Sequence, residues 1–424
     1  MSGKNSGALR PWTYLISFGL GGAANGLTAC IGTLLMLSRG LSLSMVSLAM
    51  ALNFSAAVLL EIPSGIAGDL WGRKRVWVFS KLVSMGSVLC YCFGSAPVVL
   101  AGCVANGVGT AFSSGTLDAL YMERWLHARG GQDVGKAGMW NSIVQYGSQA
   151  AGSLAGGLLS AVPLFGRAYS VNLALALALI LAMTVWTIFT VPADSPARER
   201  PACAGKGPLA QMAQQGKSAL QAAAGTPVLL LSLLGALVVG FSTVGIELYW
   251  QPHLQALAGG GEIGPLLGLL SCGGMAAVVA GNAATAHFAA RVRTERGRVA
   301  LYLAARLLMT GFMILAAVLL RLPVFCAMYL LYYLAMGMQD NADAVLLHGA
   351  ARDETRGTIM SVQSLLLRLG ALASQAVSAA ALVFLGVPAL WLLLAAALGT
   401  GTAASALAYA AAGRKRRRAL REGN

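Results

Sequence analysis

The stretch EIPSGIAGDLWGRKR, Glu61 to Arg75, concentrates charge in a chain that carries very little of it. Within it stand a glutamate, a proline, an aspartate, several small residues and three consecutive cations. The 424 residues are 57% hydrophobic and 11% charged, and the mean hydropathy is +0.70. A soluble domain of this size needs far more charge to cover its surface. The composition therefore predicts a polytopic membrane protein.

On both sides of this stretch the chain divides into apolar runs. A membrane-spanning helix needs roughly 20 mostly apolar residues. By that criterion the sequence predicts twelve spans, which are Trp12–Leu37, Leu43–Ala67, Val76–Gly94, Pro97–Met122, Ala137–Val162, Ala168–Val191, Thr226–Trp250, Ile263–Ala290, Val299–Leu320, Pro323–Ala350, Thr358–Leu385 and Pro388–Ala411.

The longest polar segment, Pro192 to Pro227, separates six predicted spans from the other six. We therefore expect an N-terminal six-helix bundle over residues 1–191 and a C-terminal six-helix bundle over residues 226–411. A linker over residues 192–225, with a short surface helix at Leu209–Ala223, and a basic tail over residues 412–424 complete the predicted organisation.

The cations are distributed unevenly between the two predicted sides. An even number of spans places both termini on one side, and that side holds most of the 30 lysines and arginines. The opposite side holds only Arg39, Arg167 and Arg321 in its predicted loops. Cytoplasmic loops carry the excess of positive charge, so we expect both termini and the linker to be cytoplasmic. The tail RKRRRALREGN is then a topology anchor, and the net charge does not indicate nucleic acid as a partner.

The opening stretch reads Gly65-xxx-Asp69-xx-Gly72-Arg73-Lys74, on the predicted cytoplasmic turn between the second and third spans. This pattern resembles the cytoplasmic loop signature of the major facilitator superfamily (MFS). The resemblance implies an all-α membrane protein with the MFS fold, two pseudo-symmetric six-helix bundles around a central cavity. It also implies a secondary active transporter that works by alternating access. The preceding EIPSG resembles the bacterial efflux-type branch, which includes drug and macrolide exporters, and implies the bacterial cytoplasmic (inner) membrane.

The residues of the signature suit a cytoplasmic gate. Gly65 and Gly68 lack side chains and would let helices approach closely, while Gly72 permits a tight turn. The superfamily arrangement implies that Asp69 lies against the N-terminus of span eleven, near Thr358 and Ile359, where free N–H donors attract an anion.

The same arrangement implies that Arg73 pairs with an acid at the end of span four, and Glu123 stands there. This cluster would close the cytoplasmic side in the outward-facing state and part in the inward-facing one. Two departures weaken the resemblance: Leu70 replaces a common cation, and Thr285 replaces the aspartate in the second half. The alternative is that the loop serves only membrane insertion and topology.

Ionisable residues at membrane depth are candidates for function. Asp340 and Asp343 are three residues apart and share a helix face. Asp340 and Arg368 each lie roughly 15 Å from the cytoplasmic edge of consecutive antiparallel spans, at 1.5 Å rise per residue. We therefore expect an Asp340–Arg368 pair that faces the cavity and leaves one acid able to take up a proton. The alternative is a neutral structural pair that holds the two helices together.

Other intramembrane charges rank lower. Glu61 and Asp118 are secondary proton-coupling candidates, and Asp118 could instead belong to the gate. Glu247 could line an outer vestibule or belong to an interfacial belt. Lys81 lies close enough to the cytoplasmic edge that its side chain can extend to it, and Arg306 is expected either to do the same or to form a structural pair.

Uncharged polar residues on the predicted spans could line the substrate cavity. Any one of them more often makes a helix–helix hydrogen bond. They are Asn25, Thr28, Asn141, Gln145, Tyr146, Gln149, Gln339, Asn341, Gln363 and Gln375.

The direction of transport rests on weaker patterns. The glycines of QYGSQAAGSLAGGLL, on span five, resemble the glycine-rich element of superfamily antiporters, although Ser153 stands where proline is usual. In span four Cys103 stands where the family often has an arginine. We expect proton-coupled export of a small amphipathic molecule. An importer or symporter of a small polar or zwitterionic nutrient or metal chelate, a lipid flippase and a non-transporting sensor remain alternatives.

Enzymatic chemistry is not expected. No Ser/His/Asp set, His–Glu metal pair or phosphate-binding loop stands at a suitable position in the sequence. We therefore predict no metal site and no cofactor, with a proton gradient as the energy source. The expected partners are a small-molecule substrate and the lipid bilayer, and the protein is expected to be a monomer.

Overall fold

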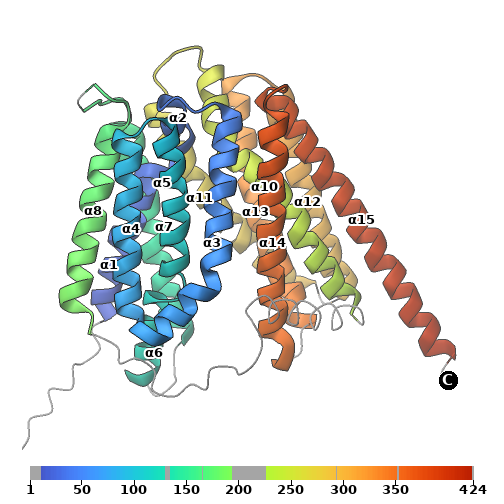
Figure 1. Ribbon diagram of the computed structural model, residues 1–424. Helices are drawn as coiled ribbons and strands as arrows, with labels where there is room; N and C mark the ends of the chain where they lie inside the picture. The colour runs from blue at the N-terminus through green and yellow to red at the C-terminus, as the bar shows by residue number, and fades with distance from the viewer. Residues whose placement is uncertain are drawn as a thin grey trace, which may run out of the picture. The chain divides into compact units, whose positions relative to one another are not determined.

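The computed structural model describes residues 11–128, 134–164, 166–192, 226–292, 294–350 and 353–422 (Figure 1). These residues form helices joined by short turns, and their one extended pairing is an isolated bridge between Leu164 and Arg167. The expected all-helical fold is confirmed. The predicted linker and its surface helix at Leu209–Ala223 lie outside the described residues.

The chain divides into two compact units. Unit 1 comprises Met1–Ala202 together with Glu262–Cys272, and unit 2 comprises Cys203–Gly261 and Gly273–Asn424. The helices of residues 11–190 are α1 (Pro11–Ala29), α2 (Gly32–Ser38), α3 (Leu43–Trp71), α4 (Arg73–Phe93), α5 (Ala96–Ser113), α6 (Leu117–Ala128), α7 (Val134–Leu159) and α8 (Ser170–Thr190). Those of residues 227–422 are α10 (Pro227–Leu257), α11 (Gly264–Arg291), α12 (Glu295–Val318), α13 (Leu322–Ala350), α14 (Asp353–Ala381) and α15 (Val387–Glu422).

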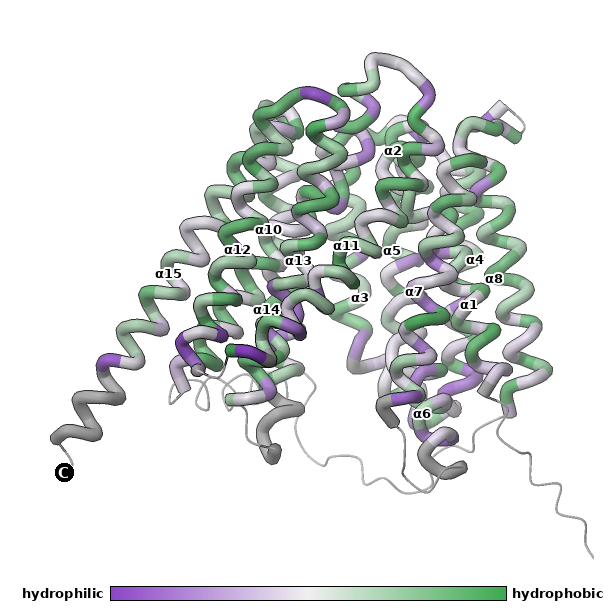
Figure 2. The backbone as a smooth tube through the Cα atoms, turned by 180° about the vertical axis from the view of Figure 1, so that it is seen from behind, coloured by the Kyte–Doolittle hydropathy of each residue, from purple (hydrophilic) through white to green (hydrophobic). Residues whose placement is uncertain are grey.

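Most of these helices are long and apolar enough to cross a bilayer, and hydrophobic colour dominates them in Figure 2. Ten described helices qualify, and the pair α1 and α2, bent by 53° at a short break, makes eleven. The predicted number of twelve is therefore not confirmed. Helix α7 is the predicted span that does not qualify, because amides and glycines lower its hydropathy although its 26 residues are sufficient in length.

Glycines determine how α1 and α7 pack in unit 1. A Cβ atom on Gly26 would lie 2.1 Å from the carbonyl oxygen of Gln149, and one on Gly152 would lie 2.3 Å from that of Ala23. The two backbones are thus in direct contact, as small residues allow at helix crossings. Ser153 adds a hydrogen bond to the carbonyl oxygen of Gly26 at 3.3 Å. The glycines of α7 therefore have a packing role.

Aromatic side chains fill one end of unit 1. Tyr121 of α6 is fully buried and contacts the rings of Tyr14, Phe18 and Trp125. Large rings bury much apolar area and hold the short helix α6 against α1. This packing fixes the position of the residues at the start of α6.

Helix α10 lies at the centre of unit 2. It packs against α13, α14 and α15, and α12 packs against α13 and α15. Its sequence is apolar on all sides, which is typical of a helix surrounded by others. Because α13 and α14 pack chiefly against α12 and α10, these consecutive helices are not close neighbours along their length.

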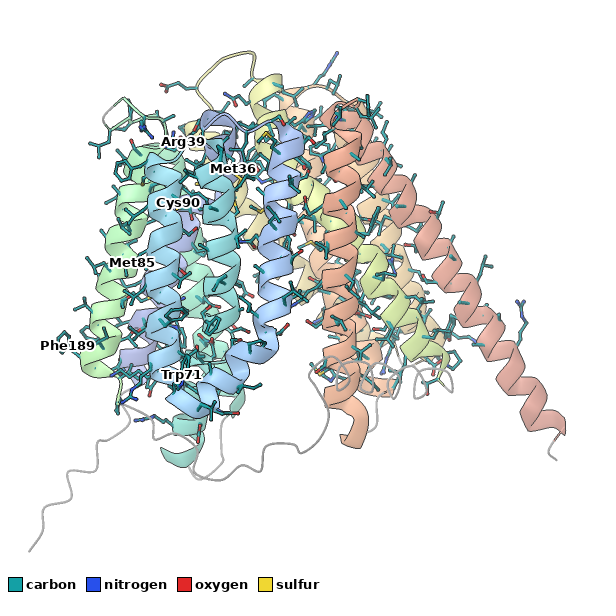
Figure 3. The ribbon with its side chains drawn as sticks, viewed as in Figure 1. Met36, Arg39, Trp71, Met85, Cys90 and Phe189 are labelled. Atoms are coloured by element: carbon teal, nitrogen blue, oxygen red, sulfur yellow. The ribbon has the colours of Figure 1, made fainter. Side chains whose placement is uncertain are left out.

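Arginines tie the helices of unit 1 together at one end. Arg39 donates to the carbonyl oxygens of Tyr91 at 2.9 Å and Ala168 at 3.0 Å, and Arg167 donates to that of Cys92 at 3.0 Å. Burial, followed by the neighbouring charge of Arg167, lowers the pKa of Arg39. Figure 3 places Arg39 at this end and Trp71 at the opposite one. The few cations on this side therefore cap helix ends.

Candidate functional site

The turn between α3 and α4 has the backbone geometry that the opening stretch predicts. Gly72 adopts φ 89° and ψ 138°, and its N–H donates to the carbonyl oxygen of Gly68 at 3.1 Å. L-residues with a side chain rarely adopt a positive φ of this kind. Arg73 follows immediately and forms an ion pair with Glu123 of α6 at 3.2 Å. The expected pairing is present, and its role in a gate stays a prediction.

Lys74 contacts the end of α8. Its ammonium donates to the carbonyl oxygens of Ile188 at 2.7 Å and Val191 at 2.6 Å. A cation is favourable at a helix C-terminus, where carbonyl groups lack partners within the helix. The cations of the signature thus fasten α4 to α6 and α8 within unit 1.

The end of α3 carries the glycines and the aspartate of the signature. Among the described residues nothing lies within 4 Å of a Cβ atom placed on Gly65, and a Cβ atom on Gly68 would lie 3.9 Å from Arg73. The close helix approach expected at these glycines stays a prediction. Pro63 interrupts the helix just before it, and Gly65 and Asp69 are exposed. A proline removes a helical hydrogen bond and favours a bend in the helix. The contact predicted for Asp69 stays a prediction.

Thr285 replaces the aspartate at the corresponding turn in the second half. Its side chain is fully buried and donates to the carbonyl oxygen of Met338 on α13 at 3.2 Å. The hydroxyl therefore joins α11 to α13, a packing role that an aspartate could not fill without burying a charge.

A buried polar cluster in unit 2 surrounds Asp343. Its carboxylate accepts a hydrogen bond from Gln363 of α14 and interacts with Ser232 of α10, which itself accepts from Gln363 at 3.0 Å. One carboxylate oxygen, Oδ1, has no hydrogen-bond partner among the described residues. Asp343 and Gln363 were both predicted site residues, and the structure brings them together.

The predicted pairing of Asp340 with Arg368 is wrong. Asp340 is exposed and forms no ion pair within the described part of the chain. The reason is the packing of unit 2, in which α10 separates most of α13 from α14. The charge of Asp340 interacts instead with the like charges of Asp343 and Glu247. Equal depth on consecutive helices does not bring side chains together when a third helix lies between them.

Arg306 supplies the nearby positive charge. It is fully buried on α12, its Nη1 donates to the hydroxyl of Tyr302 at 3.0 Å, and its charge attracts Asp343. Its Nε and Nη2 have no hydrogen-bond partner among the described residues. The expectation that it extends to the membrane edge is wrong, because its face of α12 is the buried one. In the sequence, the apolar Met309 stands three residues after Arg306 and therefore on the same helix face, which is a signal that this face is buried.

The remaining predicted residues of unit 2 surround these acids. Gln339 is buried, Asn341 is half-buried, and each has a side-chain oxygen without a partner among the described residues. Glu247 is exposed on α10 and interacts electrostatically with Tyr329, Tyr332 and Tyr333 of α13. Unit 2 therefore carries a row of acids bordered by amides and tyrosines.

Unit 1 contains two adjoining cavities, of about 480 and about 350 Å³. Both are within the range of small-molecule sites. Residues common to both linings come from α1, α4, α5 and α8, and they are Gly21, Asn25, Lys81, Ser113 and Met183. Thr28 lines the larger cavity, and Asp118, Gln145 and Gln149 line the smaller one.

Lys81 stands where the two cavities adjoin. Its ammonium lies 5.2 Å from the ring centroid of Trp77, and it interacts electrostatically with Asp118. It shares the inward face of α4 with buried Trp77, four residues earlier, and its extension to the cytoplasmic edge stays a prediction. That spacing is visible in the sequence and is the signal by which Lys81 could have been recognised.

Other predicted residues divide between the cavities and the surface. Asn141 donates to Asp118 at 2.9 Å, so two predicted residues meet across α7 and α6. Tyr146 is 57% exposed and absent from both cavity linings. Glu61 is exposed on α3. The described residues contain no group of three or more His, Cys, Asp and Glu side chains that could hold a metal ion.

Comparisons with solved structures show the fold. The chain is similar to the nucleoside transporter NupG, with 12% identity, a TM-score of 0.76 and coverage of 94% of this chain and 98% of that one. It is similar to the POT family transporter PepTSo, with 12% identity, a TM-score of 0.69 and coverage of 96% and 99%.

It is also similar to a bacterial homologue of the human lysosomal transporter Spinster, with 16% identity, a TM-score of 0.65 and coverage of 97% and 96%. No curated protein matches the sequence. The family model described as Major Facilitator Superfamily matches residues 13–375. The turn after α3 and the helical fold agree with this family match. The chain therefore belongs to the Major Facilitator Superfamily and is a multi-pass membrane transporter, not an enzyme.

Proposed function

We propose that this transporter is proton-coupled, works by alternating access and exports a small amphipathic molecule from the cytoplasm. The environment of Asp343 is the observation that supports proton coupling. This carboxylate is buried, has one oxygen without a partner among the described residues, and is attracted by the buried Arg306. A buried carboxylate can alternate between a charged form held by a nearby cation and a neutral form, which is what proton coupling requires.

Export is supported by sequence patterns. EIPSG resembles the efflux-type branch, and the glycines of α7 resemble the antiporter element, although they also pack α7 on α1. The proposed setting is a bacterial inner membrane with both termini cytoplasmic, and the proposed functional form is a monomer. The placement of the cations supports this orientation.

The test uses proteoliposomes that contain the full chain, an inside-acid gradient and the pH dye pyranine. A panel of amphipathic amines, carboxylates, dipeptides and nucleosides is added outside. We expect at least one compound to accumulate while the lumen loses acid faster, as antiport requires. Asp343→Asn should abolish this coupled proton movement, whereas Asp340→Asn should retain more of it. Normal coupling in the Asp343→Asn variant would contradict the assignment of the proton site.

Import of a small polar or zwitterionic solute is the second candidate. It is supported by the similarity to the nucleoside transporter NupG and to a POT family peptide transporter. The same vesicles distinguish the two candidates, since symport would acidify the lumen as the solute enters. Redistribution of labelled lipid without movement of any solute would instead indicate a flippase.

A further inference from the structure

We propose that the two adjoining cavities of unit 1 form a binding site for the anionic group of a small amphipathic organic anion, with Lys81 as the charged anchor. The meaning of this site as a substrate subsite rests on the proposed transport function. The binding itself follows from the contacts, charges and walls of the cavities.

The first observation is the environment of the Lys81 ammonium. Among the described residues its attractive interactions are with the ring of Trp77 at 5.2 Å and with the charge of Asp118, and no hydrogen bond or ion pair there satisfies its three N–H donors. A lysine at membrane depth that lacks a close anion is unfavourable and is found where it faces a partner or water. The cavities that Lys81 lines provide the space for that partner.

The second observation is that Asp118 does not serve as this partner. Its Oδ1 accepts from the Asn141 amide at 2.9 Å, and it makes no ion pair with Lys81. The amide therefore holds the carboxylate at the edge of the smaller cavity. A ligand anion at Lys81 would complete the charge-assisted hydrogen bonds that the protein leaves unmade.

The side chains that line the two cavities indicate the chemistry of the uncharged part of the ligand. Around Lys81 the cavities combine the indole of Trp77 and the thioether of Met183 with the polar side chains of Asn25 and Ser113. An apolar surface with a few polar groups is typical of sites for small organic molecules. A carboxylate attached to a small aromatic or aliphatic group matches this combination, whereas an inorganic anion would leave the apolar walls uncovered.

The experiment measures the thermal unfolding midpoint of the purified full chain in lipid nanodiscs. The probes are benzoate, benzyl alcohol and benzylamine, which share the ring and differ in charge. We expect benzoate alone to raise the midpoint of the wild type. Lys81→Met should weaken this effect about tenfold or more, as expected for loss of a charge-assisted contact, and Lys81→Arg should retain part of it. Asp118→Asn should strengthen it, because a repelling carboxylate is removed.

Lys136→Met is the matched control, since it removes the same charge from an exposed position at the start of α7 and should respond to benzoate like the wild type. The proposal is overturned if benzylamine stabilises as well as benzoate, if Lys81→Met keeps the wild-type response, or if no probe stabilises the protein. If Lys81→Met fails to fold, two other measurements still test the proposal. They are the contrast between benzoate and benzyl alcohol in the wild type and the response of Asp118→Asn to benzoate.

Binding in nanodiscs needs no gradient, so the two proposals can fail separately. Benzoate binding without solute-linked proton movement in vesicles would contradict the transport proposal alone. Solute-linked proton movement without benzoate binding would contradict the anion site alone.

Discussion

Arg306 and Asp343 carry opposite charges inside unit 2, and the stability of each depends on its immediate environment. A guanidinium with zero exposure stands near a carboxylate on the neighbouring helix, and a Cβ atom on Gly235 would collide with the hydroxyl of Tyr302 and approach Nη1 of Arg306 to 2.8 Å. The glycine on α10 therefore makes room for the charge. Removing one member of a buried charged set leaves the other uncompensated, whereas removing both can be nearly neutral.

We therefore predict strong coupling between Arg306→Met and Asp343→Asn in stability. Each single change should lower the free energy of unfolding, and the double variant should lose less than the sum by about 1–3 kcal/mol. Thermal unfolding of the four proteins in nanodiscs at neutral pH measures this cycle. Additive losses would show that the two side chains do not interact.

A second residue-scale prediction concerns the turn of the opening stretch. Gly72→Ala should destabilise the protein by about 1–2 kcal/mol, because an alanine is strained at positive φ. Glu123→Gln should change stability by less than about 1 kcal/mol, since exposed ion pairs contribute little, and this pair is 26% and 55% exposed. A larger loss for Glu123→Gln than for Gly72→Ala in thermal unfolding would contradict this order.

At the scale of elements, the contact of α1 with α7 depends on backbones that touch. Where the backbones of a helix pair touch, an added atom meets backbone that cannot move aside and must separate the two helices. Since α1 and α7 also carry Asn25, Gln145 and Gln149, a shift at the crossing would alter the cavity that these residues line. Packing and the candidate site are thus linked through the same helices.

We predict that Gly152→Ala lowers the free energy of unfolding by on the order of 1–3 kcal/mol, as overpacking does. Its Cβ atom would lie 2.3 Å from a backbone oxygen of α1, which cannot rotate away. The control is Gly147→Ala on the same helix, where no atom lies within 4 Å of the new Cβ among the described residues. This control should be neutral or slightly stabilising, because alanine favours a helix. Equal effects of both changes would refute the argument.

At the scale of the whole molecule, the cations determine the expected orientation in the bilayer. The turns predicted to face the periplasm are poor in cations, and the turn between α10 and α11 contains Gly259, Gly260 and Gly261 with only Glu262 nearby. The last part of the sequence, from Arg414 onward, is rich in arginine. An excess of lysine and arginine is retained on the cytoplasmic side during insertion.

We predict opposite labelling of Gly260→Cys and Glu422→Cys by a membrane-impermeant maleimide, each in a background without the seven native cysteines. In intact cells only Gly260→Cys should react, and Glu422→Cys should react after permeabilisation. Fluorescence of the labelled band on a gel measures this. Labelling of Glu422→Cys in intact cells would contradict the predicted cytoplasmic position of the C-terminus.

The sequence by itself determined the class of the protein and most of its apolar helices. Apolar runs, the placement of cations and Gly72 with its positive φ are local or additive properties, so they can be read without knowing which helices touch. The pairing of Arg73 with Glu123 was also predicted, because it followed from a motif at a fixed turn.

Only the tertiary structure decided which charges meet. Asp340 and Arg368 match in depth but are not paired with each other, while Lys81 lines the cavities of unit 1 and Arg306 is fully buried. The physical reason is that depth along a helix follows from residue number, whereas the direction of a side chain depends on the rotation of each helix and on the neighbour against which it packs.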